Sequence, residues 1–177
     1  WEGRNLSEEC DLEPWEIGYV PQFSIAYDEL TVDEAIEAAT RLRVKCRNTG
    51  ELDQRIDRVL EETGLAPIAD RHIRFLSGGQ KRRLGLAMEL VSDPKLLLCD
   101  EVTSGLDPRS EREIVHLLHD LSRNDGRTVI LVTHSLAHLE LYDSILVSHE
   151  GSVAFHGPPS QLTHYFSVDD SEEVYPT

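Results

Sequence analysis

Apolar residues recur along this chain with two different periods. Short runs of consecutive apolar or β-branched residues at 17–20, 96–99 and 128–133 predict strands. The run at 96–99 is apolar throughout, which indicates a strand buried on both faces of a sheet. Two further runs at 144–148 and 152–156 flank Glu150-Gly151 and predict a β-hairpin.

Between these runs, apolar positions three and four residues apart predict helices. Thr31 followed by Glu34 forms a capping box that begins the first helix. A second helix is expected over 53–63 and ends at Gly64, and a third follows Gly79 and ends at Asp93-Pro94. A fourth begins at Pro108, and a short last helix covers 161–166. Strands alternating with helices predict an α/β fold with a mostly parallel sheet.

Composition narrows the classes of function. The chain has 33 acidic and 17 basic residues and a formal net charge of −16, which disfavours binding to nucleic acid. Its three cysteines, Cys10, Cys46 and Cys99, are scattered without a C-x-x-C spacing, so neither a disulfide framework nor a zinc site is indicated. Each apolar run is too short to cross a membrane.

Polar side chains follow three of the predicted strands. Gln22 comes after the strand at 17–20, Asp100 and Glu101 end the strand at 96–99, and His134 ends the strand at 128–133. Open α/β sheets bind ligands outside the carboxyl ends of their strands. These residues are therefore expected to lie at one edge of one sheet.

A second candidate site is the start of the third helix, Leu76-Ser77-Gly78-Gly79-Gln80. A hydroxyl group and two glycines precede the helix, so backbone N–H groups are open to an approaching anion. An ordinary capped helix would show the same residues. The order of the motifs along the chain favours the functional interpretation.

That order is LSGGQ, then LLLCDE, then Ser104-Gly105-Leu106-Asp107, and it resembles the ATP-binding cassette (ABC) ATPases. The resemblance implies a P-loop NTPase core with a mostly parallel sheet and an inserted α-helical subdomain. The core would comprise residues 1–22 and 95–177, and the helical subdomain residues 23–94. Thr31 to Glu34, Gly157-Pro158-Pro159 and Tyr165-Phe166 look most like the G-type branch and its bacterial relatives.

The resemblance also implies roles for the residues at the strand ends. Gln22 would be the Q-loop glutamine, which reaches the Mg²⁺ ion and the attacking water. Asp100 would be the Walker B aspartate that holds Mg²⁺ through water, and Glu101 the general base. His134 would contact the γ-phosphate. Asp107 would belong to the D-loop, and it also suits the N-cap of the helix that begins at Pro108.

Family membership further implies ATP and Mg²⁺ as cofactors and two protein partners. Ser77, Gly78, Gly79 and Gln80 would act in trans, on ATP bound to a second ABC ATPase domain. The helical subdomain would meet a membrane-spanning permease at the cytoplasmic face of the cell membrane. The transported substrate and the direction of transport would reside in that permease.

One family motif is absent from the sequence. The chain contains no G-x-x-x-x-G-K-[ST], and none of its lysines, Lys45, Lys81 and Lys95, follows a glycine. Because this Walker A motif precedes the Q-loop in the family, we expect an N-terminally truncated cassette. Val102 also stands where many relatives have proline.

Two other functions share these motifs. A soluble ABC-class ATPase of DNA repair would carry a long coiled-coil insertion between Gln22 and Ser77, and the sequence has none. A non-hydrolysing module would lend only its signature motif to an intact partner. Glu101 and His134 argue against that module, because a site released from catalysis needs neither residue.

Overall fold

We describe the protein from a computed structural model, which defines residues 12–23, 26–124, 126–168 and 174. These residues divide into two compact units, one ending at Thr133 and the other beginning at His134. Each unit is described by itself. The predicted boundaries of the helical subdomain, at 22/23 and 94/95, lie inside the first unit and stay a prediction.

A three-stranded parallel sheet forms the centre of the first unit. Its strands are β1 (Ile17–Val20), β2 (Leu96–Asp100) and β3 (Thr128–Val132), in the order β1-β2-β3. Val20 pairs with Cys99, and Asp100 pairs with Val132, so the three carboxyl ends lie at one edge of the sheet. The parallel sheet predicted from the apolar runs is confirmed.

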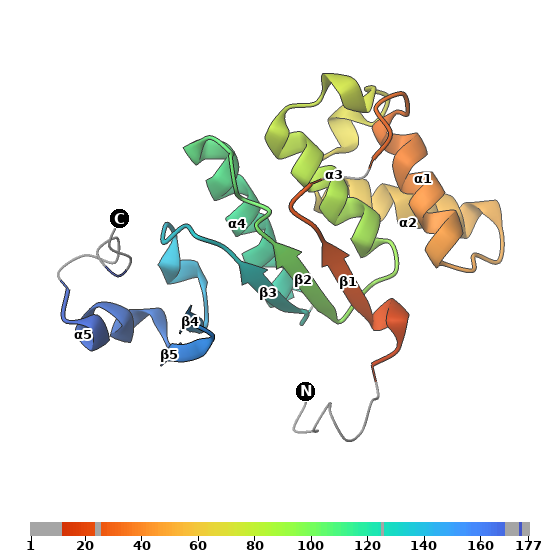
Figure 1. The fold of residues 1–177 in the computed structure, drawn as a ribbon. Helices are drawn as coiled ribbons and strands as arrows, with labels where there is room; N and C mark the ends of the chain where they lie inside the picture. The colour runs from red at the N-terminus through yellow and green to blue at the C-terminus, as the bar shows by residue number, and fades with distance from the viewer. Residues whose placement is uncertain (1–11, 24–25, 125, 169–173, 175–177) are drawn as a thin grey trace. The chain divides into compact units, whose positions relative to one another are not determined.

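Four α-helices accompany this sheet and leave one of its faces open (Figure 1): α1 (Val32–Arg43), α2 (Thr49–Glu62), α3 (Gly78–Leu90) and α4 (Pro108–Asn124). Short 3-10 helices cover Pro14–Glu16, Ala66–Ile68 and Ile73–Phe75. The predicted capping box of α1 is present, since Thr31 accepts from the N–H of Glu34 and the Glu34 side chain accepts from the N–H of Thr31. Gly64 has the predicted left-handed conformation after α2, with φ of +67°.

The start of α2 differs from the prediction. The helix begins at Thr49 rather than Asp53, because the Asn48 side chain accepts from the N–H of Glu51 and caps it. The first buried residue of α2 is Leu52. The first three residues of the helix, 49–51, include no apolar residue, so the apolar pattern of the sequence did not indicate this turn.

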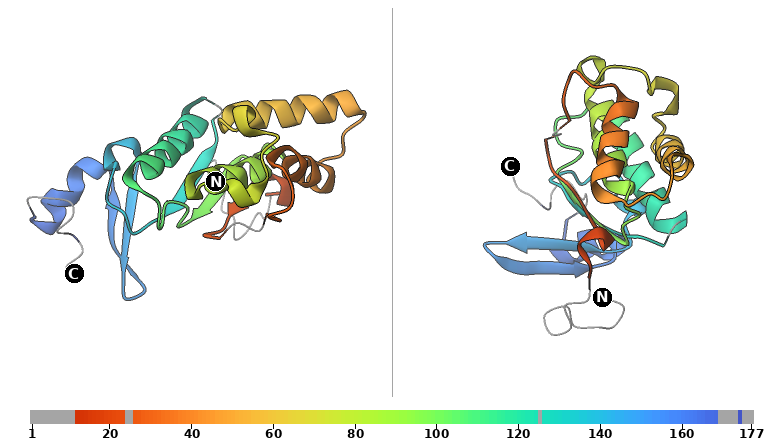
Figure 2. Two further views of the ribbon diagram at one scale, coloured as in Figure 1. Left: turned by 90° about the horizontal axis from the view of Figure 1, so that it is seen from above. Right: turned by 90° about the vertical axis from the view of Figure 1, so that its right-hand side faces the viewer.

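Helix α3 links the helices to the sheet. It packs against α1, α4 and β1, while α4 packs against β3, as the two views of Figure 2 help to follow. Leu84, Leu86 and Leu90 of α3 are fully buried in one continuous core with residues from the other three α-helices and from all three strands of the sheet. Burying a leucine side chain contributes about 1.5–3 kcal/mol, so α3 is the main apolar connection between the layers.

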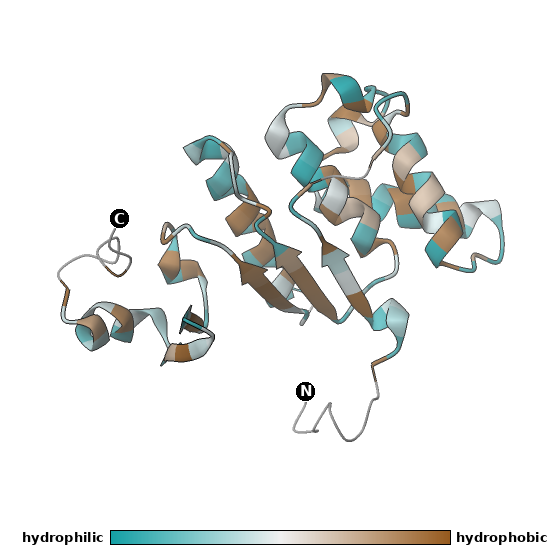
Figure 3. Ribbon diagram, in the orientation of Figure 1, coloured by the Kyte–Doolittle hydropathy of each residue, from teal (hydrophilic) through white to brown (hydrophobic). Residues whose placement is uncertain are grey.

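In the part of the chain that the structure describes, the sheet face away from α3 and α4 is exposed. Figure 1 looks onto it, with α4 behind β2 and β3, and Figure 3 shows that these strands are largely hydrophobic. Tyr19, Ile130 and Val132 on this face are 50%, 50% and 53% exposed. Parallel sheets are normally covered on both faces.

Buried charges also connect the helices to the sheet. The Glu89 carboxylate of α3 pairs with Arg43 at the end of α1 and accepts a hydrogen bond from the N–H of Tyr19 in β1. Arg127, just before β3, is buried and donates to Oδ1 of Asp93 at 2.8 Å. Its guanidinium group also lies 4.0 Å from Glu62 of α2. These groups fix the helices against both outer strands.

The second unit contains the predicted hairpin, built from β4 (Ile145–His149) and β5 (Ser152–Gly157). Glu150 and Gly151 form its turn with φ of +48° and +76°, which confirms the prediction. The helix α5 (Leu162–Phe166) follows, and 3-10 helices cover Leu139–Leu141 and Pro159–Gln161. A small core of Val147, Phe155 and Leu162 holds this unit together.

Candidate functional site

Two of the three predicted strand ends meet in the first unit. Gln22 lies two residues beyond the end of β1, and its Nε2 atom donates a hydrogen bond of 2.8 Å to Oε2 of Glu101. Asp100 is the last residue of β2, and Glu101 follows it directly. The structure therefore brings together Gln22, Asp100 and Glu101, as the sequence indicated.

The backbone holds Glu101 in an unusual conformation. Its φ is +47°, in the left-handed region that residues with a Cβ atom rarely adopt. Its N–H group donates to the carbonyl oxygen of Val132 at 2.9 Å, which extends the contact between β2 and β3 by one residue. Strained backbone of this kind clusters at functional sites, and here it turns Glu101 toward Gln22.

Asp100 has a partner that the sequence did not indicate. The hydroxyl group of Tyr19 donates to Oδ2 of Asp100 at 3.1 Å. The hydrogen bond to this carboxylate raises the pKa of Tyr19 above its ordinary value of 10.0, with smaller contributions from desolvation and from the charge. A hydrophobic strand position gave no sign of this polar contact.

His134 follows β3 but belongs to the second unit. Its side chain is exposed. Its predicted role at the γ-phosphate therefore stays a prediction.

The signature segment begins α3 with a reciprocal cap. The Ser77 hydroxyl oxygen accepts from the N–H of Gln80 at 3.3 Å, and Oε1 of Gln80 accepts from the N–H of Ser77 at 2.9 Å. The N–H groups of Gly78 and Gly79 occupy the first two helical positions, where a helix offers no acceptor of its own. Ser77 and Gly78 are exposed, so an anion can reach this helix end from solvent.

Gly79 has a packing role in addition to the predicted one. It is buried, and a Cβ atom here would lie 3.0 Å from Oγ and 3.1 Å from Cβ of Ser110 in α4. The absence of a side chain at Gly79 thus allows α3 to approach α4. A bulky residue at 79 would therefore disturb this helix contact in addition to the approach of an anion.

Asp107 caps α4, as predicted. Its Oδ1 atom accepts from the N–H groups of Arg109 and Ser110, each at 3.1 Å. Hydrogen bonds from the Ser110 side chain and backbone, together with that from Arg109, lower the pKa of Asp107 below its ordinary value. A role for Asp107 between two protomers stays a prediction.

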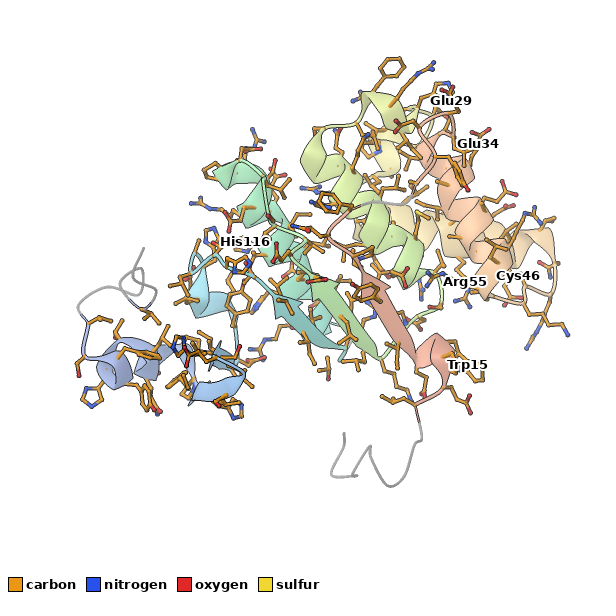
Figure 4. The ribbon with its side chains drawn as sticks, viewed as in Figure 1. Trp15, Glu29, Glu34, Cys46, Arg55 and His116 are labelled. Carbon is orange, nitrogen blue, oxygen red and sulfur yellow. The ribbon has the colours of Figure 1, made fainter. Side chains whose placement is uncertain are left out.

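The starts of α3 and α4 line one pocket of about 350 Å³. Ser77, Gly79 and Gln80 contribute from α3, and Asp107 and Ser110 from α4. Two arginines at its wall are held by one carboxylate, since Glu113 lies 2.5 Å from Arg83 and 3.0 Å from Arg109. Figure 4 labels His116 on α4, and this residue is exposed.

The three basic residues after Gln80, Lys81-Arg82-Arg83, are partly buried, and two of them form ion pairs. Lys81 lies 3.2 Å from Asp28, and Arg83 pairs with Glu113 of α4. Burial lowers the pKa of Arg82. The triplet therefore contacts neighbouring elements of its own unit.

The side chains at the carboxyl ends of β1 and β2 have a chemistry that fits Mg²⁺. The carboxylate of Asp100 and the amide oxygen of Gln22 are hard oxygen ligands, which this ion prefers. Among the described residues, no group of three or more His, Cys, Asp and Glu side chains could hold a metal by itself. Mg²⁺ in phosphate sites uses one or two protein ligands and takes the rest from phosphates and water.

A parallel sheet with acidic and amide side chains at its carboxyl edge is the arrangement at which open α/β proteins bind their ligands. Residues 1–104 match the sequence model of the ABC transporter family. The solved structure of CbiO1 from Clostridium perfringens, described as part of the ABC transporter complex cbiONQ, superposes with a TM-score of 0.77. That alignment has 31% identity and covers 90% of this chain and 61% of CbiO1.

The chain belongs to the ABC transporter family and has the fold of its P-loop ATPases. It is 37% identical over 179 aligned residues to the ABC transporter ATP-binding/permease protein Rv1747 of Mycobacterium tuberculosis, covering 100% of this chain and 21% of that protein. It is 36% identical over 159 residues to the ATP-binding cassette transporter ABCG2 of Bos taurus, covering 85% and 24% respectively. The chain thus spans less than a quarter of these relatives.

Both relatives fit the G-type and bacterial branch that the motifs indicated. In the part of the chain that the structure describes, no helix is long and apolar enough to cross a membrane.

Proposed function

We propose that this chain supplies the ATP-hydrolysing part of an ABC transporter. The observation that carries the proposal is the hydrogen bond between Gln22 and Glu101 beside Asp100, at the carboxyl ends of β1 and β2. Phosphoryl transfer requires a metal ligand and a group that polarises the attacking water. These three side chains provide both functions within one hydrogen-bonded group.

Asp100 would hold Mg²⁺, and Gln22 would orient both the ion and the attacking water. When bound, Mg²⁺ neutralises the charge that develops on the phosphate oxygens during transfer. Glu101 takes the proton of the attacking water as general base, a function that contributes about 10²- to 10⁴-fold in rate. His134 contacts the γ-phosphate.

The start of α3 acts on ATP held by a second ABC ATPase domain. The hydroxyl proton of Ser77 is free to be donated while its oxygen caps the helix, and the N–H groups of Gly78 and Gly79 carry the positive end of the helix dipole. The pocket beside Asp107 gives this helix end room to receive a phosphate. ATP then joins the two domains.

The energy of this cycle serves a membrane-spanning permease. Rv1747 is named an ATP-binding/permease protein, and the CbiO1 structure is titled as part of a transporter complex. We place the chain at the cytoplasmic face of the cell membrane, peripheral to or fused with the permease. The formal charge of −16 disfavours a nucleic acid partner.

The phosphate cradle must come from outside these 177 residues, because the sequence has no G-x-x-x-x-G-K-[ST]. We define the completed cassette as this chain joined to a segment that carries that motif. Titration with a fluorescent ATP analogue should show tight binding to the completed cassette and none to the 177-residue chain. Micromolar binding by the chain alone would mean that the nucleotide site lies elsewhere.

A non-hydrolysing signature module is the second candidate. It would need Ser77 to Gln80 but not Glu101. Measured hydrolysis by the completed cassette, lost on substitution of Glu101, separates the two functions.

A further inference from the structure

Tyr19 contacts two carboxylates, that of Glu89 through its backbone N–H group and that of Asp100 through its hydroxyl group. Through the register of β1 and β2, Tyr19 pairs with Leu98, and Asp100 lies two residues further on. Side chains two residues apart on a strand share a face. The phenol ring of Tyr19 therefore reaches Asp100 diagonally across the exposed face, and its hydroxyl group donates to Oδ2 at 3.1 Å.

The backbone of Tyr19 is held from the other side. Its N–H group donates to Oε2 of Glu89 at 3.1 Å. Glu89 is only 9% exposed, and Arg43 pairs with both of its carboxylate oxygens. A buried carboxylate is stable only with such partners, so its position is well defined.

We infer that Tyr19 is a positioning residue for the metal site. Glu89 fixes the backbone of Tyr19, and the Tyr19 hydroxyl group holds the Asp100 carboxylate through Oδ2, so that its other oxygen atom would be available to the Mg²⁺ site. The inference rests on the proposed function, which assigns Mg²⁺ to Asp100. It adds a connection from α1, through Arg43 and Glu89, to the carboxylate that serves the ion.

Without the hydroxyl group, the Asp100 carboxylate can rotate, and part of the Mg²⁺ affinity is lost. Substitutions of residues that hydrogen-bond to a metal ligand cost about 10- to 100-fold in metal affinity, and we expect about 10-fold because the phenol of Tyr19 is half exposed. The loss should concern Mg²⁺ alone. Binding of metal-free ATP should be unchanged.

The test measures the Mg²⁺ dependence of ATP-analogue binding to the completed cassette. Tyr19→Phe removes one oxygen atom and should raise the Mg²⁺ concentration at half-effect about 10-fold, the lower limit for residues that hydrogen-bond to a metal ligand. Tyr27→Phe is the matched control, since Tyr27 is also an exposed tyrosine of this unit, and it should match the parent protein. Asp100→Asn should abolish the Mg²⁺ effect.

The outcomes separate the inference from the proposed function. If Asp100→Asn weakens Mg²⁺ dependence and Tyr19→Phe does not, the positioning role is wrong and the function stands. If neither variant changes it, the assignment of Mg²⁺ to Asp100 fails, and the inference fails with it.

A second measurement tests the Glu89 connection on the 177-residue chain. Glu89→Ala removes the acceptor for the Tyr19 N–H, whereas Glu89→Gln keeps an oxygen atom there. We expect faster hydrogen exchange of the Tyr19 amide in the first variant than in the second. Equal exchange in both would overturn the role given to Glu89.

Discussion

The amide of Gln22 and the carboxylate of Glu101 are joined by a 2.8 Å hydrogen bond between the ends of two neighbouring strands. Each side chain restricts the other, and together they define where a water molecule can be held. A carboxylate that accepts one hydrogen bond retains further acceptor sites for that water.

Glu101→Gln should leave ATP binding intact and lower turnover by roughly two to four orders of magnitude, because an amide cannot act as a base. The amide oxygen can still accept from Gln22, so the local structure should persist. Phosphate release by the completed cassette measures the effect, with Glu61→Gln on the exposed surface of α2 as control. Turnover near the parent value would assign the base to another residue, with His134 next.

Ser77→Asp should abolish ATP-driven dimerisation. Aspartate is as good an N-cap as serine, so α3 remains capped, but its negative charge repels the phosphate. Thr31→Asp provides a matched control, because Thr31 caps α1 with the same capping box. Size-exclusion chromatography with ATP, in the Glu101→Gln background that traps ATP, should show dimers of the control and monomers of Ser77→Asp.

Trans action has its own test. A Ser77→Asp subunit mixed with one that lacks the Walker A lysine should recover one composite site per heterodimer. Absence of ATP-dependent dimers in this mixture would count against trans action. Gly79→Asp, by contrast, should lower the free energy of unfolding through its contact with Ser110, so it is unsuited to this test.

The three strands, the capping box of α1 and the hairpin turn at Glu150-Gly151 could be predicted because each depends on neighbouring residues. The contacts of Tyr19 with Asp100 and of Gly79 with Ser110 could not, since they join residues far apart in sequence. Asp100 and Glu101 were predictable as strand-end residues. Tyr19 gave no signal, because an aromatic residue in a strand is ordinary.

Arg127→Met should lower the free energy of unfolding of the first unit by about 1.5–3 kcal/mol, the usual contribution of a hydrogen bond between charged groups. Arg127 is 6% exposed, and its loss removes the cation that donates to Asp93 and lies 4.0 Å from Glu62, leaving Arg58 as the neighbouring cation of both carboxylates. Urea denaturation followed by circular dichroism measures this. Arg109→Met, whose side chain is 88% exposed, should change stability little.

Stability should also fall in acid through Asp93. Desolvation raises its pKa, but the hydrogen bond from Arg127 and the charges of Arg58, Arg127 and Arg55 outweigh it, so the pKa is lowered below 3.8. The stabilisation is therefore present above about pH 3.8 and is lost as the pH falls through the lower folded value. Asp93→Asn should flatten the dependence of the unfolding midpoint on pH below 4, and an unchanged slope would exclude Asp93 as its source.

The two described cysteines should react very differently with thiol reagents. Burial raises the pKa of Cys99 to about 12, and its side chain is 1% exposed. Cys46 is only partly buried. At pH 8, peptide mapping after alkylation should find Cys46 modified and Cys99 intact until urea is added. Rapid alkylation of native Cys99 would show that β2 opens readily.

The left-handed backbone at Glu101 sets the proposed role of this residue as general base against thermal stability. A residue with a Cβ atom costs roughly 1–2 kcal/mol in this conformation, and glycine does not. Selection of variants for heat resistance alone would therefore enrich Glu101→Gly, which relaxes the backbone and discards the base. In a library screened by melting temperature, substitutions of Glu101 should be the first to remove ATPase activity. Directed evolution of this domain therefore needs a simultaneous selection for turnover.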